Sequence, residues 1–226
     1  MAIIQSGANS TSLLTVDPTF AAIRVSDHPP EILGSYQIGL TSGALTVAAA
    51  GSTVFSFRWA PATTTQLCMV RRVEVGFSTA TAFTTAQSLQ YSMQVARQWT
   101  ASDTGGVAAA FTQTNTGKMR TTMPTSAFAG GGQIMIANTG ANTAGTRTLD
   151  TQAMAFTNGI SNAVGAVLTA QPIWQHQPGD YPLILAANEG FIINNVQTMG
   201  AAGVINLVVN VEWMEMNATT GNAIAY

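Results

Sequence analysis

Apolar and polar residues alternate with a period of two along much of the chain, which is the pattern of half-buried β-strands. In SLQYSMQVARQW, the residues Leu89, Tyr91, Met93 and Val95 fall on one face and the residues between them on the other. TVFSFRW and CMVRRVEVGF alternate in the same way. Helical spacing would scatter these apolar positions around an axis, so the pattern predicts strands.

Further strand candidates are QIMIAN, RTLDTQAMAF, QPIWQH and YPLIL, and turn-rich stretches such as ASDTGG, TQTNTGK and NTGANTAGT lie between candidates. About eight to ten short strands without a convincing amphipathic helix predict an all-β fold, a single β-sandwich or jelly-roll-like domain. Residues 101–145 are poorer in apolar residues and are predicted to form long loops, whereas 161–170 are compatible with a short helix or another loop.

The beginning of the chain has a different composition. We predict an extended N-terminal arm over residues 1–34 and the sandwich domain over 35–226, because SGANSTS is polar and Pro29-Pro30 cannot lie in a central strand. Apolar surface on the arm needs cover, either from its own sandwich or from a neighbouring subunit. The second alternative favours a homo-oligomer and makes the apolar arm residues candidate interface residues: Ile3, Ile4, Leu13, Leu14, Val16 and Phe20.

The most regular stretch, EGFIINNVQTMGAAGVINLVVNVEW at residues 189–213, is predicted to form a closing hairpin. A bulge is expected near Asn194 and Asn195, where the alternation changes. In VINLVVNVEW the odd-numbered positions are apolar and form one continuous face. The opposite face carries Asn206, Val208 and Asn210, which we take as a candidate contact surface.

A second candidate interface is the loop region from Phe111 to Phe128. Met119, Met123 and Phe128 lie there among turn residues. The alternative, that these apolar side chains cover their own sandwich, is equally open at this stage.

Charge changes the picture of the surface. Charged residues make up 8% of the chain, the net charge is −2, and Lys118 is the single lysine. A typical soluble domain contains about 25% charged residues. A polar but nearly uncharged surface suits a protein that packs against its own copies or other neighbours, and it offers no basic footprint for nucleic acid. Neither a membrane-spanning run nor a signal peptide is found in the sequence, so no membrane partner is expected.

The residues that could carry chemistry are few. The lone cysteine, Cys68, lies in the apolar run LCMV and is interpreted as a buried residue. His176, four residues before Asp180, lacks the context of a catalytic triad, and Glu212 and Glu215 fall on opposite faces of a strand. We therefore predict no enzyme activity and no catalytic, cofactor-binding or metal-binding residues.

One catalytic alternative stays open. Carboxylates distant in sequence, such as Asp150, Asp180 and Glu189, could be assembled by the fold into a hydrolase site. Sandwich folds do host glycosidases.

Several stretches resemble a group of tailed-bacteriophage virion structural proteins. They are VDPTFAAIRVSDHPPEILGSYQIGLTSG, FSFRW, the pair ASDTGG and AGTRTLDTQ, and PGDYPLILAANEGFIINNVQTMGAAGVINLVVNVEWMEM, in the same order from Val16 to Met216. The resemblance implies a capsid decoration or cement protein first, a trimeric β-sandwich that clamps the major capsid protein or another virion protein noncovalently. It implies a chain made in the bacterial cytoplasm and located in the virion.

The same resemblance leaves a second role open. A tail or head-fibre component could act as a host-recognition module that reads cell-surface glycans through loop aromatics such as Tyr181 or Trp174. Both roles are structural or binding roles, and neither needs a cofactor.

Overall fold

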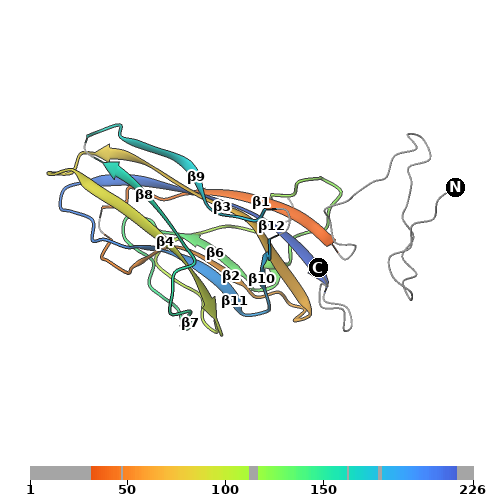
Figure 1. The fold of residues 1–226 in the computed structure, drawn as a ribbon. Coiled ribbons are helices and arrows are strands. Elements are labelled where there is room, and N and C mark those ends of the chain that lie inside the picture. Colours follow the sequence, from red (N-terminus) through yellow and green to blue (C-terminus); the bar gives the residue numbers. More distant parts are fainter. Residues whose placement is uncertain (1–31, 47, 112–116, 162, 178–179, 218–226) are drawn as a thin grey trace, which may run out of the picture. The chain divides into compact units, whose positions relative to one another are not determined.

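Two antiparallel β-sheets pack face to face in the computed structural model, which describes residues 32–46, 48–111, 117–161, 163–177 and 180–217 (Figure 1). Within these ranges the elements follow one another in chain order: β1 Ile32–Thr41, β2 Thr53–Trp59, β3 Gln66–Thr81, β4 Gln87–Arg97, β5 Val107–Ala108, the 3-10 helix η1 Ala127–Gly130, β6 Gln133–Ile136, β7 Thr148–Leu149, β8 Ala155–Ser161, β9 Val167–Gln175, β10 Leu183–Leu185, β11 Glu189–Asn195 and β12 Val204–Asn217.

The five-stranded sheet has β12 between β1 and β3. On the other side of β3, β10 pairs with Cys68 to Val70 and β9 pairs with Arg72 to Ser78. The path of β9 is irregular, with two register shifts opposite β3. At one of them the backbone of residues 168 and 170 approaches Gly76 so closely that a Cβ atom there would lie 2.8 Å from a β9 carbonyl oxygen.

The seven-stranded sheet runs in the order β5, β6, β2, β11 and β4. At its far edge β4 pairs with two short partners, β7 opposite Ala96 and Arg97 and β8 opposite Gln87 to Met93. All ladders in both sheets are antiparallel.

The core between the sheets is rich in aromatic rings. Phe57 on β2 packs against Phe191 on the neighbouring strand at 4.9 Å and against Trp213 on the opposite sheet at 5.7 Å between ring centroids. Phe128 of η1 packs against Phe57 and Trp213, with its ring centroid 4.7 Å from that of Phe57 and 5.3 Å from that of Trp213. Edge-to-face and offset contacts of this kind add to the stabilisation that burial itself supplies.

The alternating pattern predicted most of the strands correctly. Leu89, Tyr91, Met93 and Val95 are buried in the core, and the alternation along β12 places every second side chain inside. The all-β sandwich is confirmed. The bulge expected near Asn194 is present as a register shift between Ile193 and Asn194.

The prediction of a closing hairpin over residues 189–213 is wrong. β11 pairs with β2 and β4 in one sheet, and β12 pairs with β1 and β3 in the other, so residues 196–203 carry the chain from sheet to sheet. Both strands turn an apolar face to the same core. Alternation predicts that face equally well for a hairpin and for a crossover, and it does not identify the pairing partner.

Two boundaries also differ from the sequence-based prediction. β1 begins at Ile32, so residues 32–34, which we assigned to the arm, belong to a strand; residues 1–31 lie outside the described residues. Residues 161–170 form neither a helix nor a long loop, because they contain the end of β8, a short turn and the start of β9.

Phe57→Ala is expected to lower the free energy of unfolding by about 3–5 kcal/mol, because it deletes a fully buried ring that contacts both sheets. Urea denaturation measures the change. Val164→Ala is the control, since Val164 is 66% exposed and its truncation should change stability by less than about 0.5 kcal/mol. Equal effects of the two substitutions would contradict the central role of Phe57.

Candidate functional site

The predicted contact surface on β12 lies on the outer face of the five-stranded sheet. Asn206, Val208 and Asn210 are half-buried between the flanking strands, while the residues between them point into the core. Val208 lies opposite Gly76 on β3 and Thr41 on β1, and the β9 backbone at residues 168 and 170 lies close to Gly76. The structure brings these three residues together as predicted.

Charge is confined to one end of this face. Asn210 Nδ2 donates to Glu74 Oε2 at 3.1 Å, and Glu74 also forms an ion pair with Arg72. Asn206 and Val208 lie opposite Ser78 and Gly76. Their strand partners Ser78, Gly76 and Thr41 are small and uncharged, so contact with another surface there would bury no charge.

The three residues of the second predicted interface differ in their exposure to solvent. Met119 is 55% exposed, and its backbone N–H donates to the carbonyl oxygen of Ser35 at 3.1 Å. Met123 is half-buried, with its sulfur accepting a hydrogen bond from the Ser35 N–H at 3.4 Å. Phe128 is 1% exposed and packs in the core, so its assignment as an interface residue is wrong and the alternative, cover for its own sandwich, holds.

The arm residues are not placed. Ile3, Ile4, Leu13, Leu14, Val16 and Phe20 lie outside the described residues.

A buried carboxylate fixes the segment that carries Met123 and Phe128. Glu215 Oε1 accepts hydrogen bonds from Ser126 Oγ at 2.5 Å and from Trp213 Nε1 at 3.1 Å, and its Oε2 accepts from the Ala127 N–H at 2.9 Å. The side chain is nearly inaccessible to solvent. Burial raises the pKa of Glu215 and outweighs the three hydrogen bonds, which lower it.

Burial also raises the pKa of two residues near Glu215, Cys68 and Tyr36. Cys68 lies opposite Glu215 on β3 and is fully buried, as predicted; burial and then the nearby carboxylate raise the pKa of its thiol. Tyr36 Oη donates to the carbonyl oxygen of Pro124 at 2.9 Å, and burial raises the pKa of its phenol. These contacts tie the segment before η1 to β1 and β12.

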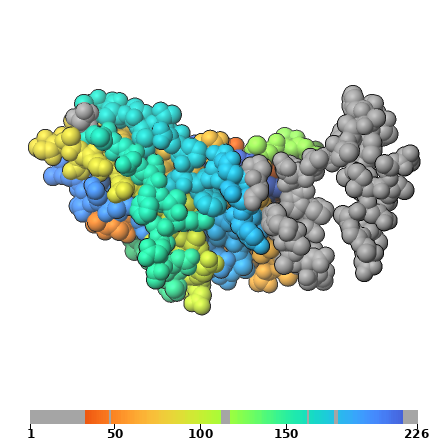
Figure 2. Space-filling view, viewed as in Figure 1, coloured from red at the N-terminus to blue at the C-terminus, as the bar shows by residue number. Residues whose placement is uncertain are grey.

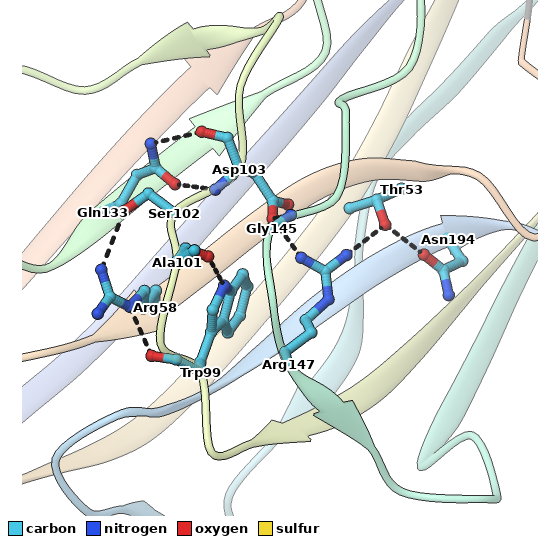
Figure 3. Close-up of polar contacts among 10 residues, drawn as sticks. All are labelled: Thr53, Arg58, Trp99, Ala101, Ser102, Asp103, Gln133, Gly145, Arg147 and Asn194. Carbon is cyan, nitrogen blue, oxygen red and sulfur yellow. Dashed lines mark hydrogen bonds and ion pairs between the residues drawn. The ribbon is translucent and has the colours of Figure 1, made fainter.

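A second buried polar cluster lies against the outer face of the seven-stranded sheet (Figure 3). Arg147 forms an ion pair with Asp103, and both side chains are at most 5% exposed. The guanidinium also donates to Thr53 Oγ1 on β2 at 2.8 Å and stacks over the Trp99 ring at 4.6 Å. The sequence motifs ASDTGG and AGTRTLDTQ, which contain Asp103 and Arg147, therefore meet in space.

Arg58 extends this cluster to a third segment. Its Nε donates to the Trp99 carbonyl oxygen at 3.0 Å and its guanidinium donates to Ser102 Oγ at 2.9 Å and to Asn188 Oδ1 at 3.3 Å. The loops after β4 and before β7 are thus held on the sheet by charge-assisted hydrogen bonds. The sequence analysis missed this role, because a single Arg and a single Asp 44 positions apart carry no local signal.

The carboxylates proposed as a possible hydrolase site are partly brought together. Arg97 pairs with Asp150 at 3.2 Å and with Glu189 at 2.8 Å, beside an open pocket of about 690 Å³. These hydrogen bonds, that to Glu189 first, raise the pKa of Arg97. Both carboxylates are therefore engaged by one guanidinium, whereas a glycosidase needs one of its two carboxyl groups protonated. The pocket lining contains no aromatic ring: Val95, Arg97, Leu149, Asp150, Thr151, Gln152, Ala153, Met154 and Leu183.

The remaining candidates for chemistry are separate from this pocket. His176 Nε2 lies 3.1 Å from the backbone carbonyl oxygen of Asp180, and the Asp180 carboxylate does not line the pocket. Within the described ranges, no three His, Cys, Asp or Glu side chains group closely enough to hold a metal ion. The same ranges contain no helix that could cross a membrane.

No protein-family model matches the chain, and no curated protein matches it. The geometry of the described surfaces therefore carries the functional argument together with the sequence motifs.

Arg147→Met is expected to lower the free energy of unfolding by about 3–5 kcal/mol, because it leaves the buried Asp103 carboxylate without its partner. The matched control is Arg97→Met, whose ion pairs are solvent-exposed and should contribute about 0–1 kcal/mol. Chemical denaturation of both variants measures the difference. Similar losses in the two variants would show that the Asp103–Arg147 pair has no special structural role.

Glu215→Gln is expected to change how stability depends on pH. Because the pKa of Glu215 is raised in the folded chain, the folded state binds this proton more tightly than the unfolded state. The wild-type protein should therefore gain stability from this group as the pH falls from the raised pKa toward the ordinary value of 4.5, and the variant should not. Urea denaturation of both proteins at several pH values tests this; a constant difference between them contradicts it.

Proposed function

We propose that this chain is a structural protein of a bacteriophage particle, acting as a capsid decoration or cement protein that binds neighbouring subunits noncovalently. The sequence stretches that resemble tailed-phage virion proteins support this role. The all-β sandwich also fits it, since a clamp needs a rigid body with extensive faces rather than a catalytic cleft.

The outer face of the five-stranded sheet carries the proposal furthest. Asn206 and Val208 lie in its middle, on a strand that is paired on both sides and is therefore rigid. Burying an uncharged face against a capsid subunit costs less desolvation free energy than burying unpaired Lys or Glu side chains. A standard interface of about 1,600 Å² repeated around a shell would make dissociation cooperative through multivalency.

The partners follow from the same role. We propose the major capsid protein or another virion protein as the neighbour, copies of this chain in a homo-oligomer, with three copies as the resemblance implies, and the virion as the location. The two buried polar clusters support a mechanical function, because the Asp103–Arg147 pair and the Glu215 contacts hold loops in place.

A host-recognition module on a fibre or tail is the second candidate. The observation that favours it is Tyr181, which is 82% exposed in the connection between β9 and β10. Exposed aromatic rings stack on sugar faces. Trp174, the other aromatic residue considered for this role, is half-buried on β9 and offers less of its ring.

Val208→Lys is expected to abolish binding of the purified protein to empty phage heads that lack it, because the substitution places a charge in the middle of the proposed contact face. Thr64→Lys, in the exposed turn between β2 and β3, is the matched control and should bind like the wild type. Co-sedimentation with heads measures binding, and circular dichroism checks the fold.

The same experiment separates the two candidates. Wild-type protein that binds intact host cells and does not bind heads would overturn the decoration role and favour host recognition. Binding to heads that is equal in the two lysine variants would overturn the proposed face.

A further inference from the structure

Among the described residues, β8 pairs with another strand on one side only. β4 is its ladder partner, and no other strand in the described part of the chain pairs with it. β9, which follows it in sequence, pairs with β3 in the other sheet. The second edge of β8 therefore has no strand paired to it within the described ranges.

The other described edge strands carry features that block pairing. Residues 117–119 cover β1, through hydrogen bonds of Gly117 and Met119 with its backbone. β9 contains Pro172 and two register shifts, and β5, β7 and β10 have only two or three residues. Proline, bulges, short length and covering segments are the devices by which proteins prevent edge-to-edge association.

β8 has none of these devices in the part of the chain that the structure describes. Its seven residues pair with β4 without a register shift, and they include no proline and no charged residue. The chain contains no Asp, Glu, Lys or Arg from residue 151 to residue 179. A long, regular and uncharged edge is the kind that a second strand extends.

Backbone geometry shows which groups face the open side. The Gln90 carbonyl oxygen accepts a hydrogen bond from the Val196 N–H at 2.8 Å, so the backbone groups of Gln90 point toward β11. Asn158 lies opposite Gln90, and opposed residues of an antiparallel pair point either toward or away from each other together. The N–H and C=O of Asn158 therefore point away from β4, as do those of Phe156 and Ile160 by alternation.

The side chains of the same three residues lie on the outer face of the seven-stranded sheet. Phe156 is 57% exposed and Ile160 is 71% exposed, with Asn158 between them. In Figure 2 the teal and cyan atoms of the β8 and β9 region form much of the surface that faces the viewer. Two large apolar side chains on one open edge are costly to leave in water.

We propose that β8 of one copy pairs antiparallel with β8 of a second copy, about a two-fold axis at Asn158. In this register Phe156 lies opposite the partner's Ile160, and Ile160 opposite the partner's Phe156. Each contact is an aromatic and β-branched cross-strand pair, a combination that stabilises sheets. The outward N–H and C=O groups of all three residues find partners in the same step.

The sequence of β8 selects a second copy as the occupant. A two-fold contact places the central residue opposite itself, which a charged side chain would oppose and Asn158 permits. Residues 151–179 carry no Asp, Glu, Lys or Arg side chain that could give charge complementarity with a different protein. The self-complementary spacing of Phe156 and Ile160 around Asn158 is what an isologous interface requires.

This pairing goes beyond the proposed function, since a protein in any role can associate through β8. It joins copies in twos, whereas the resemblance implies three. The two are compatible when β8 links copies that belong to different trimers, and two trimers joined through all three β8 edges contain six chains.

Charge substitutions at Asn158 test the two-fold axis. Asn158→Lys and Asn158→Asp each place like charges opposite each other, and each variant alone should associate about tenfold more weakly than the wild type. An equimolar mixture places Lys opposite Asp and should restore association. Sedimentation velocity and light scattering of the full chain measure the mass, and circular dichroism checks that both variants fold.

A cysteine substitution tests the register. In a hydrogen-bonded antiparallel pair the Cα atoms are about 5.5 Å apart, within the range that a disulfide spans. Asn158→Cys should form disulfide-linked dimers on mild oxidation, whereas the wild type, whose Cys68 is buried, should not. Thr41→Cys, exposed on β1, is the matched control and should remain unlinked.

Each other outcome overturns the proposal. A wild-type monomer at high concentration means that β8 is not a self-association edge, whether or not residues 1–31 or another protein occupies it. An oligomer whose mass does not respond to either Asn158 variant uses a different surface. Variants that dissociate but are not restored by mixing do not meet at a two-fold axis.

Discussion

The packing of aromatic rings between the two sheets is the interaction on which the rest of the fold depends. Trp213 on β12 is in contact with Tyr36, Phe57 and Phe128, so one ring joins strands of both sheets and the η1 segment. With few charged residues, the protein relies on buried apolar area for stability. Two buried polar clusters fix segments around that core. Glu215 holds η1 beside Trp213, and Arg147 holds loops on the outer face of the seven-stranded sheet.

The strands could be predicted from the sequence because their inner faces are apolar at every second position. The same pattern could not predict which strands pair, as the separation of β11 and β12 into different sheets shows. Pairing depends on contacts between distant residues, and those contacts leave the period of two unchanged. Phe128 was misassigned for a related reason: its short sequence context is that of a turn, while its burial is set by the rings of Phe57, Trp59 and Trp213.

The candidate surfaces differ in how far the sequence could reveal them. Asn206, Val208 and Asn210 follow from alternation alone, since any half-buried strand has an outer face. The edge of β8 that no described strand pairs with could not be predicted, because an edge is defined by the absence of a neighbour. Exposed Phe156 and Ile160 alternate with inward residues of β8. This alternation indicates a contact edge only in a strand that has β4 on one side and no described strand on the other.

The crossover between β11 and β12 also constrains synthesis. β11 lies between β2 and β4, and β12 lies between β1 and β3, so the last two strands in the described part of the chain each lie inside a sheet. Neither sheet can be completed before residues 189–217 have left the ribosome. Until then the inner faces of β2, β3 and β4 lack their neighbours, and the chain must remain soluble with these apolar faces uncovered. A chain truncated before residue 189 therefore lacks the strand that joins β2 to β4 in one sheet and the strand that joins β1 to β3 in the other, so folding of this sandwich is a late event.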